Sequence, residues 1–367
     1  MQILAVDVGT GTQDVLLFDT DREPENALKM VMPSPTALLA QSIRAATEAG
    51  EDLLLTGVTM GGGPCAWAAG DHLKAGQRLF ATPDAARTFN DDLEEVAAMG
   101  VEVIAEEEAA AGVPGARRLA MVDFDYEALA SAFRAFGVDL DRSDVLAVAV
   151  FDHGAAPPGY SDRLFRFEYL AQRIEAGVGL AGFAFRRHEI PPSMTRLQAA
   201  ASTAPDDHPL VVMDTAPAAV LGALEDPRVR AHREPVVVNV GNMHTLAFHL
   251  RDGGIAGLFE HHTGLLNREK LEHLLAQLAS GALSHKELFA EHGHGALVLD
   301  PAPSRLDLVA VTGPRRRMLS GSPLHPYFAV PYGDMMMAGC WGLVRACARI
   351  LPWTAEAIEG VLGPLQY

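Results

Sequence analysis

The sequence predicts an α/β protein built from two related lobes. Short apolar runs typical of strands alternate along the chain with helical patterns rich in Ala and Leu, which favours largely parallel sheets. A glycine-containing hairpin opens each half of the chain, at residues 3–18 and again at residues 235–250. A motif that recurs in this way indicates a duplicated fold.

The expected elements follow this alternation in both halves of the chain. Strands are expected at residues 2–8, 14–19, 27–32, 52–58, 101–105, 144–151, 235–241, 244–250, 254–260 and 306–312. Helices are expected at residues 35–49, 64–75, 90–99, 125–136, 267–280, 284–292 and 334–350. Between the two halves, Pro157 and Pro158 break the pattern, and residues 160–205 are expected to be helical with a break at Pro191.

The turn of the first hairpin suits a bound phosphate. It follows a buried strand and contains Asp7, Gly9, Thr10, Gly11 and Thr12. Glycine lets the backbone approach an anion closely and leaves amide donors pointing at it. We expect the Thr10 and Thr12 hydroxyls to contact phosphate oxygens and Asp7 to hold Mg²⁺, directly or through water. The alternative is an ordinary hairpin in which Asp7 caps the turn.

The second hairpin repeats this order of residue types. Its turn contains Asn239, Gly241, Asn242, His244 and Thr245. Together the two hairpins suggest one nucleotide gripped between two lobes. Asn239 stands where the first hairpin carries a carboxylate, and this removes one charge that would face Mg²⁺. Nucleotide binding without rapid hydrolysis is therefore an alternative.

Two further segments are candidates for contact with a substrate. Gly61 and Gly62 belong to a turn between a strand and a helix, and a helix N-terminus behind the turn would favour an anion. Asp152 and His153 follow an apolar strand, where substrate-facing loops commonly lie on such sheets. Structural roles, a tight turn in one case and hydrogen bonding in the other, are the alternatives. Cys65, beside the glycine turn, is a candidate for a lowered pKa.

Histidines recur near the predicted turns, and imidazole is a good ligand for zinc or iron. His261 and His262 are adjacent on a strand, so their side chains point to opposite faces and at most one serves a given site. His261 is taken as the candidate metal ligand. The pair His292 and His294 is expected in a surface turn, and hydrogen bonding in turns is the alternative for all of these histidines.

Five segments of the chain resemble segments that recur in a fixed order in the actin-like ATPase superfamily of sugar kinases, Hsp70 and actin. Residues 7–12 resemble its first phosphate loop and residues 239–245 its second. Residues 210–222 resemble the first connecting segment, in which a strand ends in an Asp and a helix of small residues follows. Residues 308–314 resemble the turn that receives adenosine, and residues 333–342 resemble the second connecting helix, where small residues let two helices cross closely.

The resemblance implies two ribonuclease-H-like lobes around a nucleotide cleft, with a helical insertion in the first lobe. The lobes are expected at residues 1–230, with the insertion at about 155–205, and at residues 231–367. It implies ATP and Mg²⁺ as cofactors, with Gly313 at the adenosine. Asp214 corresponds to the Asp that, in hexokinase-like relatives, takes the proton from the hydroxyl that attacks the γ-phosphate.

The chain also resembles a bacterial and archaeal branch of this superfamily labelled pyruvate formate-lyase activating enzyme. The shared segments include Asp152 to Gly154, Thr312 to Arg316 and Gly333 to Met336. Enzymes of that activity need three closely spaced cysteines for an iron–sulfur cluster. The three cysteines here, Cys65, Cys340 and Cys347, lack that spacing, which argues against radical chemistry.

Three functions follow as hypotheses. The first is an ATP- and Mg²⁺-dependent phosphotransferase of the small-molecule kinase type, with Asp214 and Asp7 as catalytic residues. The second is a nucleotide-driven activator of a partner protein, which reads the closure of the lobes. The third is a metal-dependent relative of the threonyl-carbamoyl transferases, which requires the histidines to meet in the cleft.

Composition narrows the partners and the compartment. A formal net charge of −18 argues against nucleic acid or an anionic membrane as a partner. Three cysteines without paired spacing fit a reducing cytoplasm, and Asp7 interrupts the first apolar run, so no signal peptide is expected. No apolar stretch reaches the length of a membrane span. A homodimer is the commonest assembly of such chains.

Overall fold

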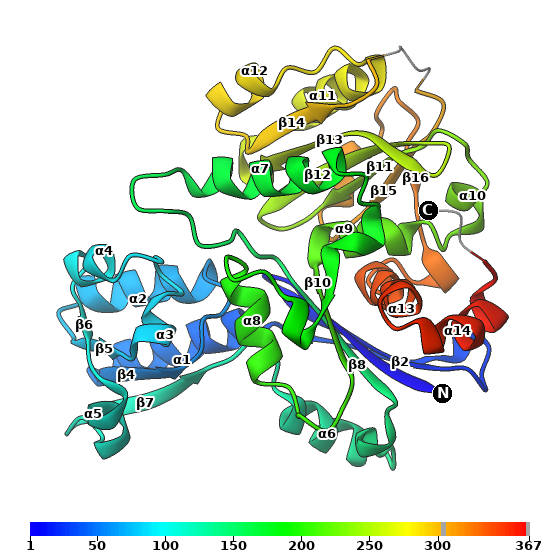
Figure 1. Cartoon of the computed structure of the whole chain (residues 1–367). Coiled ribbons are helices and arrows are strands. Elements are labelled where there is room, and N and C mark those ends of the chain that lie inside the picture. The colour runs from blue at the N-terminus through cyan, green and yellow to red at the C-terminus, as the bar shows by residue number, and fades with distance from the viewer. Residues whose placement is uncertain (302–305, 365–367) are drawn as a thin grey trace.

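A computed structural model describes residues 1–301 and 306–364, and Figure 1 shows its three sheets and the helices that cover them. The α-helices are α1 (Pro35–Ala49), α2 (Pro64–Lys74), α3 (Pro83–Ala86), α4 (Leu93–Ala98), α5 (Glu106–Ala111), α6 (Tyr126–Arg134), α7 (Asp162–Glu175), α8 (Thr195–Ser202), α9 (Thr215–Ala223), α10 (Pro227–Arg230), α11 (Arg268–Ser280), α12 (His285–Ala290), α13 (Ala338–Ile350) and α14 (Ala355–Leu362). Seven of them lie within or close to the expected helices; the expected helix at 334–350 begins only at Ala338.

The first sheet has the strand order β3-β2-β1-β8-β10-β9. Its strands are β1 (Gln2–Val8), β2 (Thr12–Asp19), β3 (Leu28–Pro33), β8 (Val145–Val150), β9 (Ala184–Arg186) and β10 (Leu210–Asp214). β1 and β2 form the first hairpin, in which Asp7 lies opposite Asp14. β1, β8 and β10 are parallel, and all six residues of β8 are buried, as expected for a strand covered on both faces.

The second sheet has the order β14-β13-β12-β11-β15-β16; its last five strands repeat the topology of β3-β2-β1-β8-β10, and β14 is added beside β13. Its strands are β11 (Val236–Val240), β12 (His244–Arg251), β13 (Gly254–His262), β14 (Gly295–Val298), β15 (Val309–Thr312) and β16 (Tyr327–Phe328). In both sheets a three-stranded antiparallel meander continues into two parallel strands beside its first strand. The predicted α/β fold with two related, ribonuclease-H-like lobes is confirmed by this repeated order.

A third sheet, smaller and wholly parallel, is inserted between β3 and β8. Its order is β6-β5-β4-β7, with β4 (Asp52–Gly57), β5 (Leu79–Ala81), β6 (Val101–Val103) and β7 (Ala116–Met121). It has a hydrophobic core of its own with α1 and α2, and it projects at the lower left of Figure 1. The sequence did not predict β5 or β7, because β5 has three residues and β7 is an edge strand that carries exposed Arg117 and Arg118.

The segment at 155–205 contains helices α7 and α8, as expected, and also the short strand β9. β9 pairs with β10 and closes the edge of the first sheet, so the expectation of an entirely helical segment is wrong at this point. Only three residues form β9, too few to give a strand pattern in the sequence. α7 contacts β14 of the second sheet, and its Arg166 binds Glu260 of β13, so this helix joins the two lobes (Figure 1).

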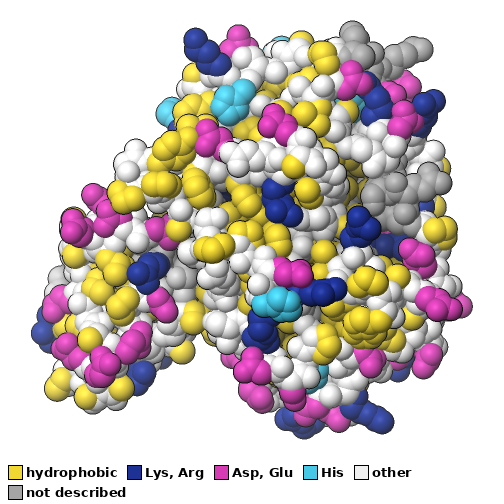
Figure 2. All heavy atoms as spheres, in the orientation of Figure 1, with side chains coloured by type: hydrophobic (Ala, Val, Ile, Leu, Met, Phe, Trp, Pro, Cys, Tyr) yellow, Lys and Arg dark blue, Asp and Glu magenta, His cyan; other side chains and the backbone are white. Residues whose placement is uncertain are grey.

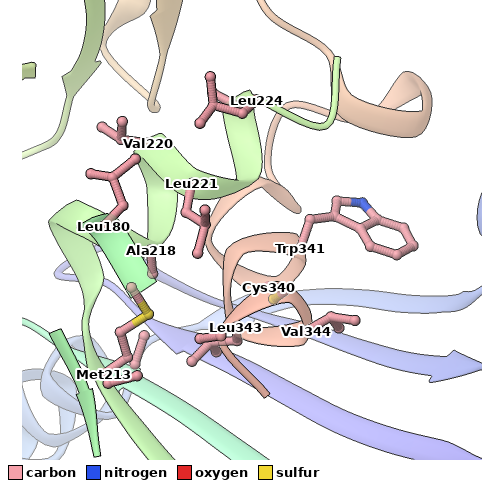
Figure 3. Close-up of a cluster of buried hydrophobic side chains, with 14 of the residues drawn as sticks. Leu180, Met213, Ala218, Val220, Leu221, Leu224, Cys340, Trp341, Leu343 and Val344 are labelled. Atoms are coloured by element: carbon pink, nitrogen blue, oxygen red, sulfur yellow. The ribbon is translucent and has the colours of Figure 1, made fainter. Parts of the chain in front are cut away.

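Helices α9 and α13 cross between the two sheets. Every residue of α9 from Ala216 to Ala223 is buried, which is typical of a helix covered on all sides. Figure 3 shows Ala218 and Leu221 of α9 next to α13, and the side chains of both helices belong to one hydrophobic core. α9 contacts β11 and β15 of the second sheet, whereas α13 contacts β1, β2 and β8 of the first.

The surface is mixed in charge. Figure 2 shows Asp and Glu side chains spread over one face rather than gathered in a single patch, and a notch between the small third-sheet unit and the rest of the molecule. Among the described residues, no helix is both long enough and apolar enough to cross a lipid bilayer.

We predict that Gly342→Ala destabilises the protein strongly, because a Cβ atom at Gly342 would lie 1.9 Å from the backbone oxygen of Ala218 across the helix crossing. Overpacking of this kind costs about 1–3 kcal/mol or more. Gly360→Ala in α14 is the matched control, because its Cβ would meet nothing within 4 Å. Urea unfolding should show a lower midpoint for Gly342→Ala and an unchanged or higher one for Gly360→Ala. Equal midpoints would contradict the close crossing.

Candidate functional site

The two hairpins face each other across a cleft with a volume of about 520 Å³. The lining includes thirteen residues that the sequence analysis singled out: Asp7, Gly9, Thr10, Thr12, Gly61, Gly62, Asp152, His153, Asn239, Gly241, Asn242, His244 and Gly313. Four others, Gly11, Thr245, Asp214 and His261, do not line it. The structure therefore brings both expected phosphate turns and the expected substrate loops to one cavity.

The two turns have the same backbone geometry. The amide of Gly9 donates to the backbone oxygen of Thr12 at 2.9 Å, and the amide of Gly241 donates to that of His244 at 3.0 Å. A Cβ atom at Gly9 would lie 2.9 Å from Thr12 O, and one at Gly241 would lie 2.7 Å from His244 O. Both turns therefore need glycine at this position.

The tips of the hairpins approach each other closely. A Cβ atom at Gly11 would lie 2.9 Å from Nδ2 of Asn242. Gly313, in the turn after β15, has a φ of +95°, and a Cβ atom there would lie 2.4 Å from Oδ1 of Asn239. The turn that resembles an adenosine site thus abuts the second hairpin, and glycine is required both by its backbone conformation and by this contact.

Asp7 lies at the N-termini of two helices. Its Oδ1 accepts a hydrogen bond from the hydroxyl of Thr215, the first residue of α9. A Cβ atom at Gly339, in the first turn of α13, would lie 1.8 Å from its Oδ2. Helix N-termini carry partial positive charge and favour anions, so this end of the cleft suits a carboxylate and a phosphate.

Asp14 was not predicted as a site residue, although it lies directly opposite Asp7 in the hairpin register. Its side chain is 8% exposed and lines the same cleft. Burial and the neighbouring charge of Asp7 raise the pKa of Asp14 to about 8. Burial raises the pKa of Asp7 to about 6, against the lowering effect of the Thr215 hydroxyl. Two crowded carboxylates of this kind are a site at which a cation would relieve both burial and repulsion. The signal in the sequence was the cross-strand pairing of two acidic residues.

Asp214 lies in a buried ion network rather than on the cleft surface. One of its oxygens accepts from the backbone amide of Ala216 at 3.0 Å and so caps α9. The other accepts from Nη1 of Arg166 at 2.5 Å, and the side chains of both residues are at most 5% exposed. Both oxygens of Asp214 therefore already have hydrogen-bond partners. The expected role of Asp214 as a catalytic base stays a prediction.

Arg166 of α7 connects the two lobes. Its Nε lies 3.0 Å from both carboxylate oxygens of Glu260, on β13 of the second sheet, while its Nη1 binds Asp214 of the first. Burial alone would lower the pKa of Arg166, but the two carboxylates raise it above its ordinary value. Burial raises the pKa of Glu260 to about 7, although Arg166 acts in the opposite direction. The sequence analysis missed this triad because its members are far apart in the chain.

The expected substrate loops are held by hydrogen bonds of their own. Asp152 accepts from the backbone amides of Gly154 and Leu197, both at 2.8 Å, and burial raises its pKa. The amide of Gly61 donates to the carboxylate of Asp123 at 3.1 Å, and Asp123 is paired with Arg196. These contacts fix the loops at the cleft without excluding a role in binding.

The expectation for Cys65 is wrong. The thiol is buried at the start of α2, and burial raises its pKa to about 11 instead of lowering it. The neighbouring carboxylate of Asp123 adds to this effect, while the hydroxyl of Thr36 opposes it. Cys65 is therefore a protonated core residue.

The structure brings together histidines from both lobes. His153, His244 and His262 line the cleft, and His294 lies buried against them. The expectation that His294 belongs to a surface turn is wrong, because its side chain is fully buried while His292 is exposed. His261, the candidate metal ligand of the sequence analysis, is not part of this group: it is buried, and its Nδ1 lies 3.0 Å from the backbone oxygen of His262.

Comparison with known proteins identifies the family of the chain. A family described as "Putative pyruvate format-lyase activating enzyme (DUF1786)" matches residues 60–318, and the chain belongs to this family. The two sheets described above agree with the two-lobed fold that the resemblance to the actin-like ATPase superfamily implies. The search of curated proteins gave no match.

Solved structures that resemble the chain do so at low identity. An inorganic polyphosphate/ATP-glucomannokinase from Arthrobacter sp. strain KM is 12% identical, with 95% of this chain and 99% of the other covered and a TM-score of 0.34. An activator of 2-hydroxyisocaproyl-CoA dehydratase from Clostridium difficile with bound ADPNP is 9% identical, with coverages of 98% and 97% and a TM-score of 0.34. A PilM–PilN type IV pilus biogenesis complex is 11% identical, with coverages of 94% and 98% and a TM-score of 0.40. The chain spans 37% of the length of a ROK-family transcriptional regulator that it also resembles, with a TM-score of 0.26.

The cysteines do not fit the iron–sulfur cluster that the family description implies. A cluster of this type is held by thiolates that converge on one point. Cys65 belongs to the core of the third sheet, whereas Cys340 and Cys347 lie on α13 and belong to a different core. The three thiols of the chain therefore lie in two separate cores, and burial raises the pKa of each of them.

We predict that Asp14→Asn removes a fall in stability with rising pH, in the absence of added metal and nucleotide. A carboxyl group whose pKa is raised on folding binds its proton more tightly in the folded state, so the free energy of unfolding falls as pH rises from about 4 to about 8. Removing this group should make the slope of the free energy of unfolding against pH more positive by roughly 1 kcal/mol per pH unit in that window.

The measurement is urea unfolding of both proteins at a series of pH values. Asp71→Asn is the control, because the Asp71 side chain is 71% exposed and lies outside the cleft. A slope for Asp14→Asn equal to that of the wild type would contradict the assignment of Asp14.

Proposed function

We propose that the chain is an ATP- and Mg²⁺-dependent phosphotransferase of the small-molecule kinase type, which binds its nucleotide between the two hairpins. The observation that carries this proposal is the convergence of both glycine turns on one cleft with the carboxylate of Asp7. Asp7, Gly9, Thr10 and Thr12 would contact one side of the phosphates. Asn239, Gly241 and Asn242 would contact the other side, and the turn at Gly313 would receive the adenosine.

The chemistry of the first hairpin supports a magnesium ion. Mg²⁺ prefers oxygen ligands and is commonly bound through one or two carboxylates together with phosphates of the substrate. Asp7 and Asp14 supply two carboxylates that already crowd each other. The ion would lie between them and the terminal phosphates, which it would hold for transfer to a hydroxyl of a small molecule.

A second function is a nucleotide-driven activator of a partner protein, and one observation favours it. The carboxylate of Asp214, which would serve as the base in a kinase, is paired with Arg166. Transfer to a hydroxyl requires this pair to open when substrate binds. If it stays closed, nucleotide binding would change only the closure of the lobes, and a protein partner would read that change.

Isothermal titration calorimetry of ATP with Mg²⁺ tests the proposal. We predict that the wild type binds the nucleotide at one site and that Asp7→Asn weakens binding by at least about tenfold, or roughly 1.4 kcal/mol. Asparagine keeps an acceptor for the Thr215 hydroxyl and removes the charge that Mg²⁺ needs. Asp71→Asn should bind like the wild type.

Two outcomes count against the proposal. If the wild type binds no MgATP, or if Asp7→Asn binds it as tightly as the wild type, the nucleotide does not occupy the expected position. ADP release in the presence of hydroxyl compounds then separates the two functions. Release stimulated by an acceptor supports phosphoryl transfer, whereas tight binding without release supports the activator.

A further inference from the structure

Four imidazoles from both lobes meet at the wall of the cleft. His153 follows β8 of the first sheet, whereas His244 begins β12, His262 ends β13 and His294 precedes β14 of the second. The ring of His294 lies 4.6 Å from that of His262 and 5.0 Å from that of His244, and His153 lies 5.2 Å from His244. One ring nitrogen each of His153, His244 and His294 lies within 4.8 Å of the other two.

Several of these nitrogens are buried without a hydrogen-bond partner among the described residues. They are Nε2 of His244 and both Nδ1 and Nε2 of His294, whose side chain is fully buried. Leaving a polar group buried and unpaired costs about 1–3 kcal/mol in proteins. A ligand shared by the two rings would satisfy one nitrogen of His244 and one of His294.

The protonation state of the cluster is the one that binds metals. Burial lowers the pKa of His153 to about 3, and the nearby guanidinium groups of Arg166 and Arg196 act in the same direction. Burial also lowers the pKa of His244, His262 and His294. All four rings are therefore neutral near pH 7, and neutral imidazole is the form that donates its lone pair to a metal ion.

Surrounding contacts hold the rings in place. His244 is stacked on Phe151 with the ring centres 4.2 Å apart, and Phe151 carries the guanidinium of Arg166 on its ring at 3.7 Å. Glu260 Oε1 lies 3.7 Å from Nε2 of His294, beyond hydrogen-bond distance, so a carboxylate lies behind this ring without bonding to it. A carboxylate behind a ligating histidine is a common feature of zinc sites.

We infer that His153, His244 and His294 bind a divalent transition-metal ion such as Zn²⁺ or Fe²⁺, with His262 beside them. Imidazole nitrogen favours these ions over Mg²⁺, which prefers oxygen, so this site differs from the one at Asp7 and Asp14. Three protein ligands leave a coordination position open, as in catalytic rather than structural zinc sites. Two of the three ligands, His153 and His244, line the cleft, so a substrate in the cleft could reach an ion held there.

The three nitrogens, which lie within 4.8 Å of one another, would have to move slightly closer to bind one ion. A tetrahedral zinc ion with Zn–N distances of about 2.0–2.1 Å has its ligand nitrogens about 3.4 Å apart. Because His153 comes from the first lobe and His244 and His294 from the second, the ion would join the two lobes. This arrangement meets the requirement of the metal-dependent hypothesis, that the histidines converge in the cleft, and it does not depend on nucleotide binding.

Titration of the chelator-treated full chain with Zn²⁺ and with Co²⁺ tests the inference. We predict one tight site per chain, and a loss of affinity of at least about 100-fold in His294→Gln and in His153→Gln, because even outer partners of metal ligands are worth 10–100-fold. The visible absorption of bound Co²⁺ should change in both variants. Having one variant in each lobe keeps the test valid if the other fails to fold, which circular dichroism will reveal.

His292→Asn is the matched control. His292 is exposed, lies two residues from His294 and has a φ of +65°, a conformation that asparagine tolerates. It should bind Zn²⁺ like the wild type. Binding that survives in both His153→Gln and His294→Gln, or that is lost equally in His292→Asn, would overturn the inference. Calorimetry with MgATP on the same variants shows separately whether the nucleotide site is intact.

Discussion

One buried guanidinium connects the two lobes next to the cleft. Arg166, 1% exposed, binds Asp214 at the end of β10 and Glu260 on β13, and thus connects the two central sheets. Removing one member of such a network would leave an uncompensated buried charge, which costs about 3–5 kcal/mol. The cation also lies on Phe151, which in turn stacks on His244. Arg166 thus contacts the residue that caps α9 and, through Phe151, lies next to the histidine cluster.

The two lobes share a topology and differ in their chemistry. The first hairpin pairs Asp7 with Asp14 across its strands, whereas the second pairs Asn239 with Leu246 at the equivalent positions. Of the two hairpins, the first thus carries paired carboxylates suited to a hard cation and the second does not. In the second hairpin, His244 occupies the position equivalent to Thr12 and belongs to the imidazole cluster. The two related hairpins thus line one cleft with carboxylates from the first and an imidazole from the second.

The sequence predicted features that rest on neighbouring residues better than features that rest on contacts between residues far apart in the chain. The hairpins, Gly313 and the small residues of α9 and α13 lie in local sequence patterns, so the fold and the glycine turns at the cleft could be predicted. Asp14 could have been found from the register of the hairpin. The pairing of Arg166 with Glu260 spans 94 residues, and the burial of His294 depends on how β14 packs. Neither leaves a local pattern. The prediction of His261 instead of His262 has a similar cause. Strand alternation shows that the two side chains lie on opposite faces, but not which face meets the cleft.

Amide hydrogen exchange with and without MgATP would show whether both hairpins hold one nucleotide. We expect the backbone amides of residues 9–12 and 241–244 to become protected together, with no comparable change in α5 beside the third sheet. Protection of one hairpin alone, or of neither while the nucleotide is bound, would mean that the two hairpins do not share the nucleotide.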